Sequence, residues 1–252
     1  MRMIKVFYCG DEVMLITTYV KGMSSWTDGV VHDESHHLQE ALRSDPEIEL
    51  TYLPTHRVQR EFPMPDEITH YDVVIFSDVG TDTIIMYEDR FLNCPMGKDR
   101  LGGLKKFVEK GGGLAGVGGW VSFGGMFGMA KWHNTPVEEA LPVTCFPWDD
   151  RVELSEGMTP DIVDESHPFF KGVDFKNAPV LFSGYNQVEI KPGAKLLAKY
   201  KNDPIIVAGE FGKGRTMVLA TDPAPHWGRG MVEWDGYTRF WLNVVKWLAK
   251  KA

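Results

Sequence analysis

One short run of the sequence combines the residue types that acid–base chemistry needs. It reads Asp222-Pro223-Ala224-Pro225-His226-Trp227. The imidazole of His226 can titrate near neutral pH, and a neighbouring carboxylate such as Asp222 can orient it as a general acid or base. The two prolines predict a rigid loop after a strand at residues 216–220. Asp222 and His226 are therefore the candidate catalytic residues, with Trp227 as a ligand contact; a His that only bonds the backbone is the alternative interpretation.

A glycine-rich junction at residues 116–125, GVGGWVSFGG, offers a second kind of chemistry. A strand that runs into a sharp glycine turn and then into a helix has the geometry of a nucleophile elbow. The position that would carry Ser or Cys is Gly118, so this elbow lacks a nucleophile. If a helix follows at residues 120–129, the backbone amides of Gly119 and Trp120 could bind an anionic or carbonyl group. Alternatively, the glycines only allow the strand and the helix to pack closely.

Polar residues also follow other strands of the expected sheet. Asp11 comes after a strand at residues 3–9, and Asp78 and Gly80 come after one at residues 71–77. Because ligands collect at the carboxyl ends of parallel strands, we expect these residues at one edge of the sheet. His133, in a loop beyond the elbow, is a further candidate. The predicted ligand-binding set is Asp11, Asp78, Gly80, Gly118, Gly119, Trp120, His133 and Trp227.

The order of elements predicts the fold that would position these residues. Apolar, β-branched runs alternate with helical patterns around residues 38–42 and 101–108. This alternation is typical of a parallel α/β sheet covered by helices on both faces. The apolar runs of the first half are residues 3–9, 48–53, 71–77 and 114–117.

The second half of the chain predicts additions to that sheet. Strand-like runs follow at short spacing, and residues 211–215 form a hairpin turn. Apolar residues between Tyr237 and Leu248 repeat at helical spacing and predict a closing helix. We therefore predict an α/β three-layer sandwich with a central mostly parallel sheet and appended antiparallel strands, in one domain over residues 1–252. The runs of the second half are residues 180–190, 194–200, 205–211 and 216–220.

Composition and missing motifs exclude several classes of function. The 252 residues carry a formal charge of −8 and no basic run, which argues against a nucleic-acid partner. No apolar stretch reaches the roughly 18 to 20 residues that span a bilayer, so no membrane partner is expected. The three cysteines lack CxxC spacing, which predicts neither disulfides nor a cysteine zinc site and favours the cytoplasm. HExxH spacing is absent, and the one GxGxxG match precedes a strand, so we expect no metal and no cofactor.

Several longer motifs together resemble a known family. They are GGWVSFGG, NTPVEEALPV, HPFFKGV, FGKGR and ATDPAPHWG. The chain is similar to a family of putative glutamine amidotransferases with the class I glutamine amidotransferase-like (flavodoxin-like) fold, and more broadly to ThuA-like trehalose-utilisation proteins. The resemblance implies an elbow cysteine that attacks glutamine, and Gly118 stands in that place. Cysteine-dependent glutaminase activity is therefore not expected; Cys9 is either a relocated nucleophile or a buried strand cysteine.

Two hypotheses about function follow. The first is a small-molecule enzyme or binder that acts at the carboxyl-terminal edge of the sheet on a sugar, a sugar acid or an amide. The second is a non-catalytic module for ligand sensing or assembly on the same scaffold, and a homo-oligomer is compatible with either. An Asp and His226 within hydrogen-bond reach around an open pocket would favour the first. A filled pocket with an exposed apolar face would favour the second.

Overall fold

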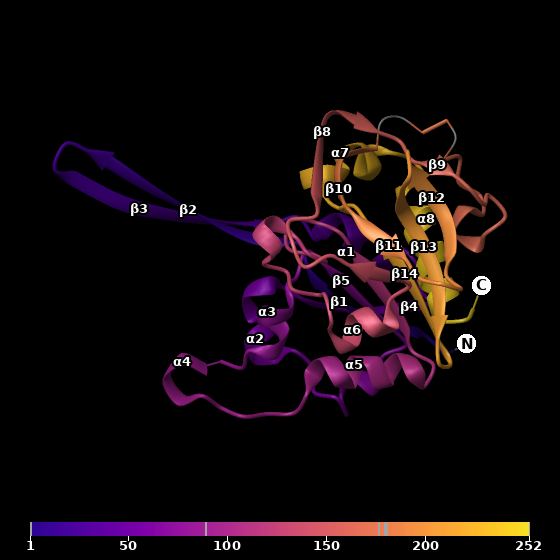
Figure 1. Cartoon of the computed structure of the whole chain (residues 1–252), viewed down its shortest axis with the longest axis horizontal. Helices are drawn as coiled ribbons and strands as arrows, with labels where there is room; N and C mark the ends of the chain where they lie inside the picture. Colours follow the sequence, from indigo (N-terminus) through magenta and orange to yellow (C-terminus); the bar gives the residue numbers. More distant parts are fainter. Residues whose placement is uncertain (1, 89, 176, 179–180, 252) are drawn as a thin grey trace.

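A central sheet of eight strands organises the protein (Figure 1). The computed structural model describes residues 2–88, 90–175, 177–178 and 181–251. The strand order is β4-β1-β5-β6-β14-β13-β12-β9. These strands are β1 (Ile4–Gly10), β4 (Ile48–Leu53), β5 (Val73–Ser77), β6 (Gly113–Val117), β9 (Asp161–Ile162), β12 (Lys195–Tyr200), β13 (Asp203–Phe211) and β14 (Gly214–Leu219).

The first five strands in this order run parallel, and the last three alternate in direction. β14 pairs with β6 in parallel, although it follows the hairpin turn from β13. Strands β1, β5 and β6 are buried on both faces, which explains their nearly continuous apolar sequences. The expected α/β fold with a mostly parallel sheet and added antiparallel strands is confirmed.

Helices cover both faces of the sheet and make three layers. Helices α1 (His36–Arg43) and α8 (Tyr237–Leu248) pack on one face. The opposite face is covered by helices that surround Phe7 and Phe76. These are α2 (Val58–Glu61), α3 (Thr81–Ile85), α5 (Arg100–Glu109) and α6 (Pro136–Ala140). A short helix α4 (Arg90–Asn93) precedes α5, and α7 (Pro225–Glu233) precedes α8.

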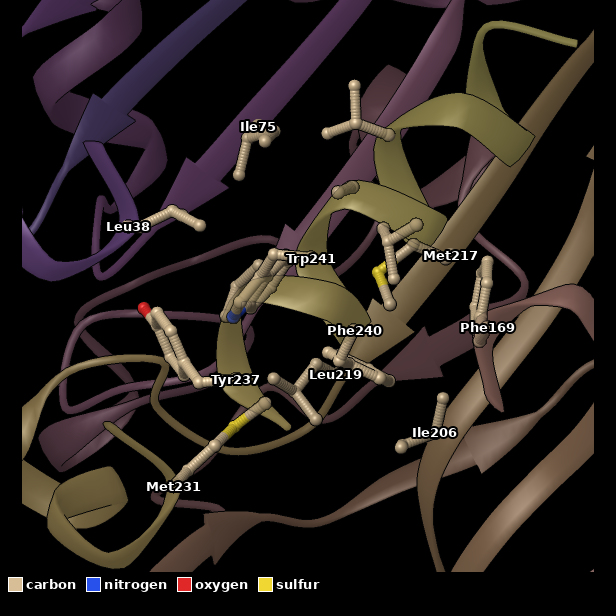
Figure 2. Packing of buried hydrophobic residues seen from close by; sticks show 14 of the residues in the cluster. Leu38, Ile75, Phe169, Ile206, Met217, Leu219, Met231, Tyr237, Phe240 and Trp241 are labelled. Atoms are coloured by element: carbon tan, nitrogen blue, oxygen red, sulfur yellow. The ribbon is translucent and has the colours of Figure 1, made fainter. Parts of the chain in front are cut away.

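The predicted closing helix α8 lies at the centre of the larger core. Phe240 and Trp241 are fully buried, and Figure 2 shows Phe240 beside the sheet residue Leu219 and Trp241 on the side toward Leu38 and Tyr237. The helical repeat of its apolar residues gives α8 one broad face to bury. Among the described residues, no helix has both the length and the apolar character that crossing a bilayer requires.

Two expected elements are wrong. Residues 120–129 contain turns and a single 3₁₀ turn at Met126–Gly128 instead of a helix. Positive φ at Gly119, Phe123 and Gly125 interrupts any regular right-handed helix.

The expected strand at residues 180–190 is also different, and residue 180 lies outside the described residues. It divides at Gln187 into β10 (Phe182–Asn186) and β11 (Val188–Ile190). Neither strand joins the central sheet: β10 pairs with β8 (Arg151–Met158), and β11 pairs with β7 (Val143–Cys145). The amide of Gln187 donates instead to the carbonyl of Asp150, 2.7 Å away, at the break.

The segment after Asp11 forms a long β-hairpin that the sequence did not reveal. Strands β2 (Glu12–Lys21) and β3 (Ser24–Asp33) pair with each other over their whole length. Figure 1 shows this hairpin projecting away from the rest of the protein. Its two ends lie at the carboxyl-terminal edge of the sheet, because it starts directly after β1.

Candidate functional site

Three aspartates lie where strands of the parallel part of the sheet end. Asp11 follows β1, Asp78 follows β5, and Asp222 comes three residues after the end of β14. Asp11 and Asp78 both have a φ of 51°, a left-handed conformation that Asp tolerates better than most residues. Gly10 precedes Asp11 with a φ of 126°, and a side chain there would collide with the backbone of Ser77. The close approach of β1 to β5 therefore turns these carboxylates toward one edge.

Burial and mutual repulsion perturb these carboxylates. Loss of solvent raises the pKa of Asp11 well above its ordinary value, and the charge of Asp222 raises it further. Burial also raises the pKa of Asp222, with Asp78 adding to the shift. Burial raises the pKa of Asp78, while the amide of Val121 opposes this by donating to its carboxylate. Such a cluster favours holding protons, as acid–base sites do.

His226 lies beside this cluster, but on a helix. The prolines were expected to hold it in a rigid loop; instead Pro225 occupies the first turn of α7, where its missing N–H costs no hydrogen bond. The His226 Nδ1 atom lies 3.0 Å from Asp222 Oδ2, and the side chain is 26% exposed. Burial lowers the pKa of His226, and Asp78 partly opposes this. Asp222 thus fixes the ring through Nδ1 and leaves Nε2 for chemistry.

An aromatic and charged rim surrounds His226. The indole of Trp120 lies edge-to-face with the imidazole at 4.5 Å, and Trp227 stacks on it at 5.1 Å. Both indole N–H groups donate to Glu153, at 3.2 Å from Trp120 and 2.9 Å from Trp227. Arg151 lies 5.6 Å from the centre of the Trp120 ring. Trp120 is 40% exposed, so the rim faces solvent.

The glycine junction is closed, in the sense that its turn at Gly118 has no space for an added side chain. A Cβ at Gly118 would lie 2.7 Å from both Asn186 Oδ1 and the Thr221 amide nitrogen, so this position has no room for a nucleophile. The Gly119 amide donates to Asn186 Oδ1 over 3.0 Å and is therefore occupied. The expected pair of free amides at a helix N-terminus is wrong, because no helix starts there and one amide already has its acceptor.

Buried polar residues that the sequence did not single out hold this junction in place. The Asn186 side chain also donates to Asp150 Oδ1, 2.9 Å away. Asp150 accepts the amides of Gly124 and Gly125 at 2.8 and 2.9 Å. Asn186 is the last residue of β10, which lies outside the central sheet, so the ends of the central strands could not point to it.

Two predicted site residues have other surroundings. His133 Nδ1 lies 2.8 Å from the Cys145 carbonyl oxygen and 3.4 Å from a Glu138 carboxylate oxygen. These contacts tie His133 to the α6–β7 segment, and none joins it to His226. Gly80 is the N-cap of α3, and a Cβ there would lie 3.1 Å from a Val121 methyl group. Gly80 therefore packs behind the junction.

The cysteines do not supply a nucleophile to this edge. Cys9 and Cys145 are buried, and burial raises the pKa of both thiols. A buried strand cysteine is thus the correct reading of Cys9. Cys94 is exposed, but its neighbours are residues of the α3–α5 segment. Within the described ranges, His, Cys, Asp and Glu side chains nowhere gather in threes with metal-binding geometry.

Residues 5–250 match the model of a family described as putative glutamine amidotransferase. This chain belongs to that family. No functionally curated protein is significantly similar to it.

Solved structures agree with membership of this amidotransferase-like family. Cytoplasmic Protein STM3548 from Salmonella typhimurium is 34% identical with a TM-score of 0.91, over 97% of this chain and 99% of that one. Cytoplasmic Protein STM1381 from Salmonella typhimurium LT2 is 32% identical with a TM-score of 0.90, over 97% and 99%. A putative ThuA-like protein from Parabacteroides merdae is 12% identical with a TM-score of 0.54, over 98% and 90%, which shows the fold alone.

Proposed function

We propose that this member of the glutamine amidotransferase-like family binds a small molecule at the carboxyl-terminal edge of the sheet and acts on it by acid–base chemistry. The observation that carries the proposal is the hydrogen-bonded pair of Asp222 and His226 beside the buried carboxylate of Asp11 and the half-buried one of Asp78. Three neighbouring carboxylates with raised pKa values lower the stability of the folded state. Proteins most often retain such destabilising groups at functional sites.

His226 has the geometry of a general base or acid. With Nδ1 directed at the Asp222 carboxylate, Nε2 is the ring atom available to a ligand. Burial lowers the pKa of His226, so the neutral ring that can accept a proton predominates at neutral pH. The charge of Asp78, whose own pKa burial raises, favours the protonated form of His226.

The rim favours a sugar, a sugar acid or an amide as the ligand. The exposed indole of Trp120 offers an apolar surface on which a sugar ring can stack. Carboxylates such as Asp78 and Glu153 accept hydrogen bonds from hydroxyl or amide N–H groups. Arg151, near Trp120, donates to Asp149 through Nε and Nη2, and its positive charge at the rim favours an acidic substituent. The two Salmonella relatives are described as cytoplasmic proteins, which supports the same location for this chain.

The proposal excludes cysteine-dependent glutaminase chemistry despite the family description. Gly118 has no space for a thiol side chain, and Cys9 is buried with a raised pKa. Purified protein should release no ammonia from glutamine. Ammonia release that disappears in Cys9→Ala would contradict this part of the proposal.

Ligand response and stability of His226→Ala test the role of His226. We would record the melting temperature with sugars, sugar acids and amides, since a ligand at 100 times its Kd adds about 2.7 kcal/mol of stability. His226→Ala should weaken binding by about 1–3 kcal/mol, or abolish turnover, with little change in the unliganded melting temperature. His133→Ala is the matched control and should keep the ligand response. Loss of stability with unchanged binding in His226→Ala would remove His226 from the site.

A further inference from the structure

The β2–β3 hairpin, residues 12–33 and here named the arm, contributes no side chain to either hydrophobic core. Every residue of β3, and every residue of β2 after Glu12, is exposed. Within the described part of the chain, β2 and β3 pair only with each other. An isolated two-stranded hairpin is marginally stable in water, so this length of arm needs a further contact to stay ordered.

Both faces of the arm are apolar. Cross-strand partners share a face and successive pairs alternate between faces, so the register assigns each side chain to one side. Tyr19 and Trp26 stack on one face with ring centres 5.2 Å apart. That face also carries Val13, Leu15 and Val30, and the opposite face carries Met14, Ile16, Val20 and Val31. These nine side chains are 44–75% exposed.

The amount of apolar surface suits a specific protein interface. At roughly half exposure each, nine large side chains present surface on the order of 800 Å². Divided between the two faces, this gives each face a patch on the order of 400 Å², and an exposed apolar patch of a few hundred Å² on a monomer marks an interaction site.

Charge and edge geometry indicate what covers the arm. Between residues 13 and 31 the only charged side chains are Lys21 and Asp28, so this stretch is neutral, whereas the whole chain carries −8. Such a surface does not attract polyanions. A neutral arm is also the part of this acidic protein on which two copies can meet with little repulsion. The outer edges of β2 and β3 offer unpaired backbone groups that require a matching strand edge.

We propose that the arms of two copies of this chain pair with each other and form a symmetric dimer. The arm is self-complementary, because it supplies both an unpaired strand edge and apolar faces. A two-fold axis that relates two hydrogen-bonded copies of one strand must be perpendicular to them, so the paired arms run antiparallel. The two bodies then lie at opposite ends of the paired arms, which separates their negative charges.

The antiparallel arrangement places the tip of each arm near the base of its partner. Ten residues per strand span about 33 Å. The base of the arm adjoins Asp11, and the Glu34 amide donates to the Asp11 carbonyl oxygen over 2.9 Å. The tip residues Gly22 and Met23 of one copy therefore approach the strand-end edge of the other. This dimer does not depend on the proposed ligand or on His226.

Sedimentation velocity at micromolar concentration tests the dimer. Wild-type protein should sediment as a dimer, and Leu15→Lys and Ile16→Lys, one on each face of the arm, should weaken dimerisation at least tenfold. Val163→Lys is the matched control, since Val163 is 51% exposed on the body, and it should remain dimeric. An unchanged melting temperature at low concentration shows that the body of each variant folds. A monomeric wild type, or a dimer that both arm variants leave intact, would overturn the proposal.

Cross-linking tests the arrangement without disrupting the arm. In a Cys94→Ser background, a mixture of Met23→Cys and Val13→Cys proteins should give a covalent heterodimer with a short bis-maleimide. Met23→Cys alone should give little product, because the two tips lie at opposite ends. Efficient Met23→Cys homodimers would overturn the antiparallel arrangement. A monomer that instead sediments with neutral phosphatidylcholine vesicles would identify a lipid surface as the occupant and would also overturn the proposal.

Discussion

The α8 core and the β2–β3 arm are both rich in large apolar residues, yet one is buried and the other is exposed. Apolar residues on α8 repeat at helical spacing along one face, and that face packs on the sheet. The arm has apolar residues on both faces, and within the described chain its strands pair only with each other. A pattern of apolar residues thus shows that a surface must be covered by other residues. When the apolar residues share one face, as on α8, one layer of the same chain covers them.

Truncating one tryptophan in each region should give the largest difference. Trp241→Ala should lower the free energy of unfolding by about 3–5 kcal/mol, because it leaves a cavity beneath the buried face of α8. Trp26→Ala should change it by less than about 0.5 kcal/mol where the chain is monomeric, since Trp26 is 52% exposed. Urea unfolding at low protein concentration measures both. Equal losses would mean that the arm packs on its own body in solution.

A glycine-to-cysteine substitution should have different effects on stability and thiol reactivity in the glycine junction and in the arm. Gly118→Cys should cost about 1–3 kcal/mol and give an unreactive thiol, because Asn186 and the Thr221 backbone fill the space. Where the chain is monomeric, Gly29→Cys in the arm should leave stability unchanged and react freely, since the nearest atom to its Cβ, the Leu15 carbonyl oxygen, is 3.8 Å away. A thiol-reactive dye in a Cys94→Ser background reports both. A stable, reactive Gly118→Cys protein would restore the open elbow.

The sequence predicted the elements that form the core. Periodicity located the four strands β1, β4, β5 and β6 and the helices α5 and α8. The strands form the central sheet and the helices pack on it, so the apolar residues of all six elements are buried in the same two cores. Strand ends and turn residues correctly pointed to Asp11, Asp78 and Asp222 at one edge.

The remaining features depend on contacts between segments that are distant in the sequence. Asn186 and Glu153 reach the site from the β8–β10 sheet, so no local pattern reveals them. The segment at residues 120–129 contains apolar residues, but side-chain contacts such as that of Asp150 with Gly124 stabilise turns there. The arm was missed because its apolar residues follow neither an alternating pattern nor a helical one.

The smallest expected effect is a change in how stability depends on pH. The folded pKa of Asp11 is raised above the unfolded value of about 4, mainly by burial and then by Asp222. The folded state therefore holds a proton that the unfolded state releases. This contribution to stability is complete below pH 4 and is lost as the pH rises toward the folded pKa.

The Asp11→Asn substitution should remove this loss of folding stability at rising pH. Asn accepts the left-handed φ of 51° and can keep the hydrogen bond from the Tyr8 hydroxyl. Wild type and Asp11→Asn should melt at similar temperatures at pH 4, and the variant should melt progressively higher than wild type from pH 5 to pH 8. Asp28→Asn, at an exposed carboxylate of the arm, is the matched control and should follow wild type at every pH. A constant offset between Asp11→Asn and wild type from pH 4 to pH 8 would show that Asp11 acts through packing instead of charge, and it would remove Asp11 from the proton-holding cluster.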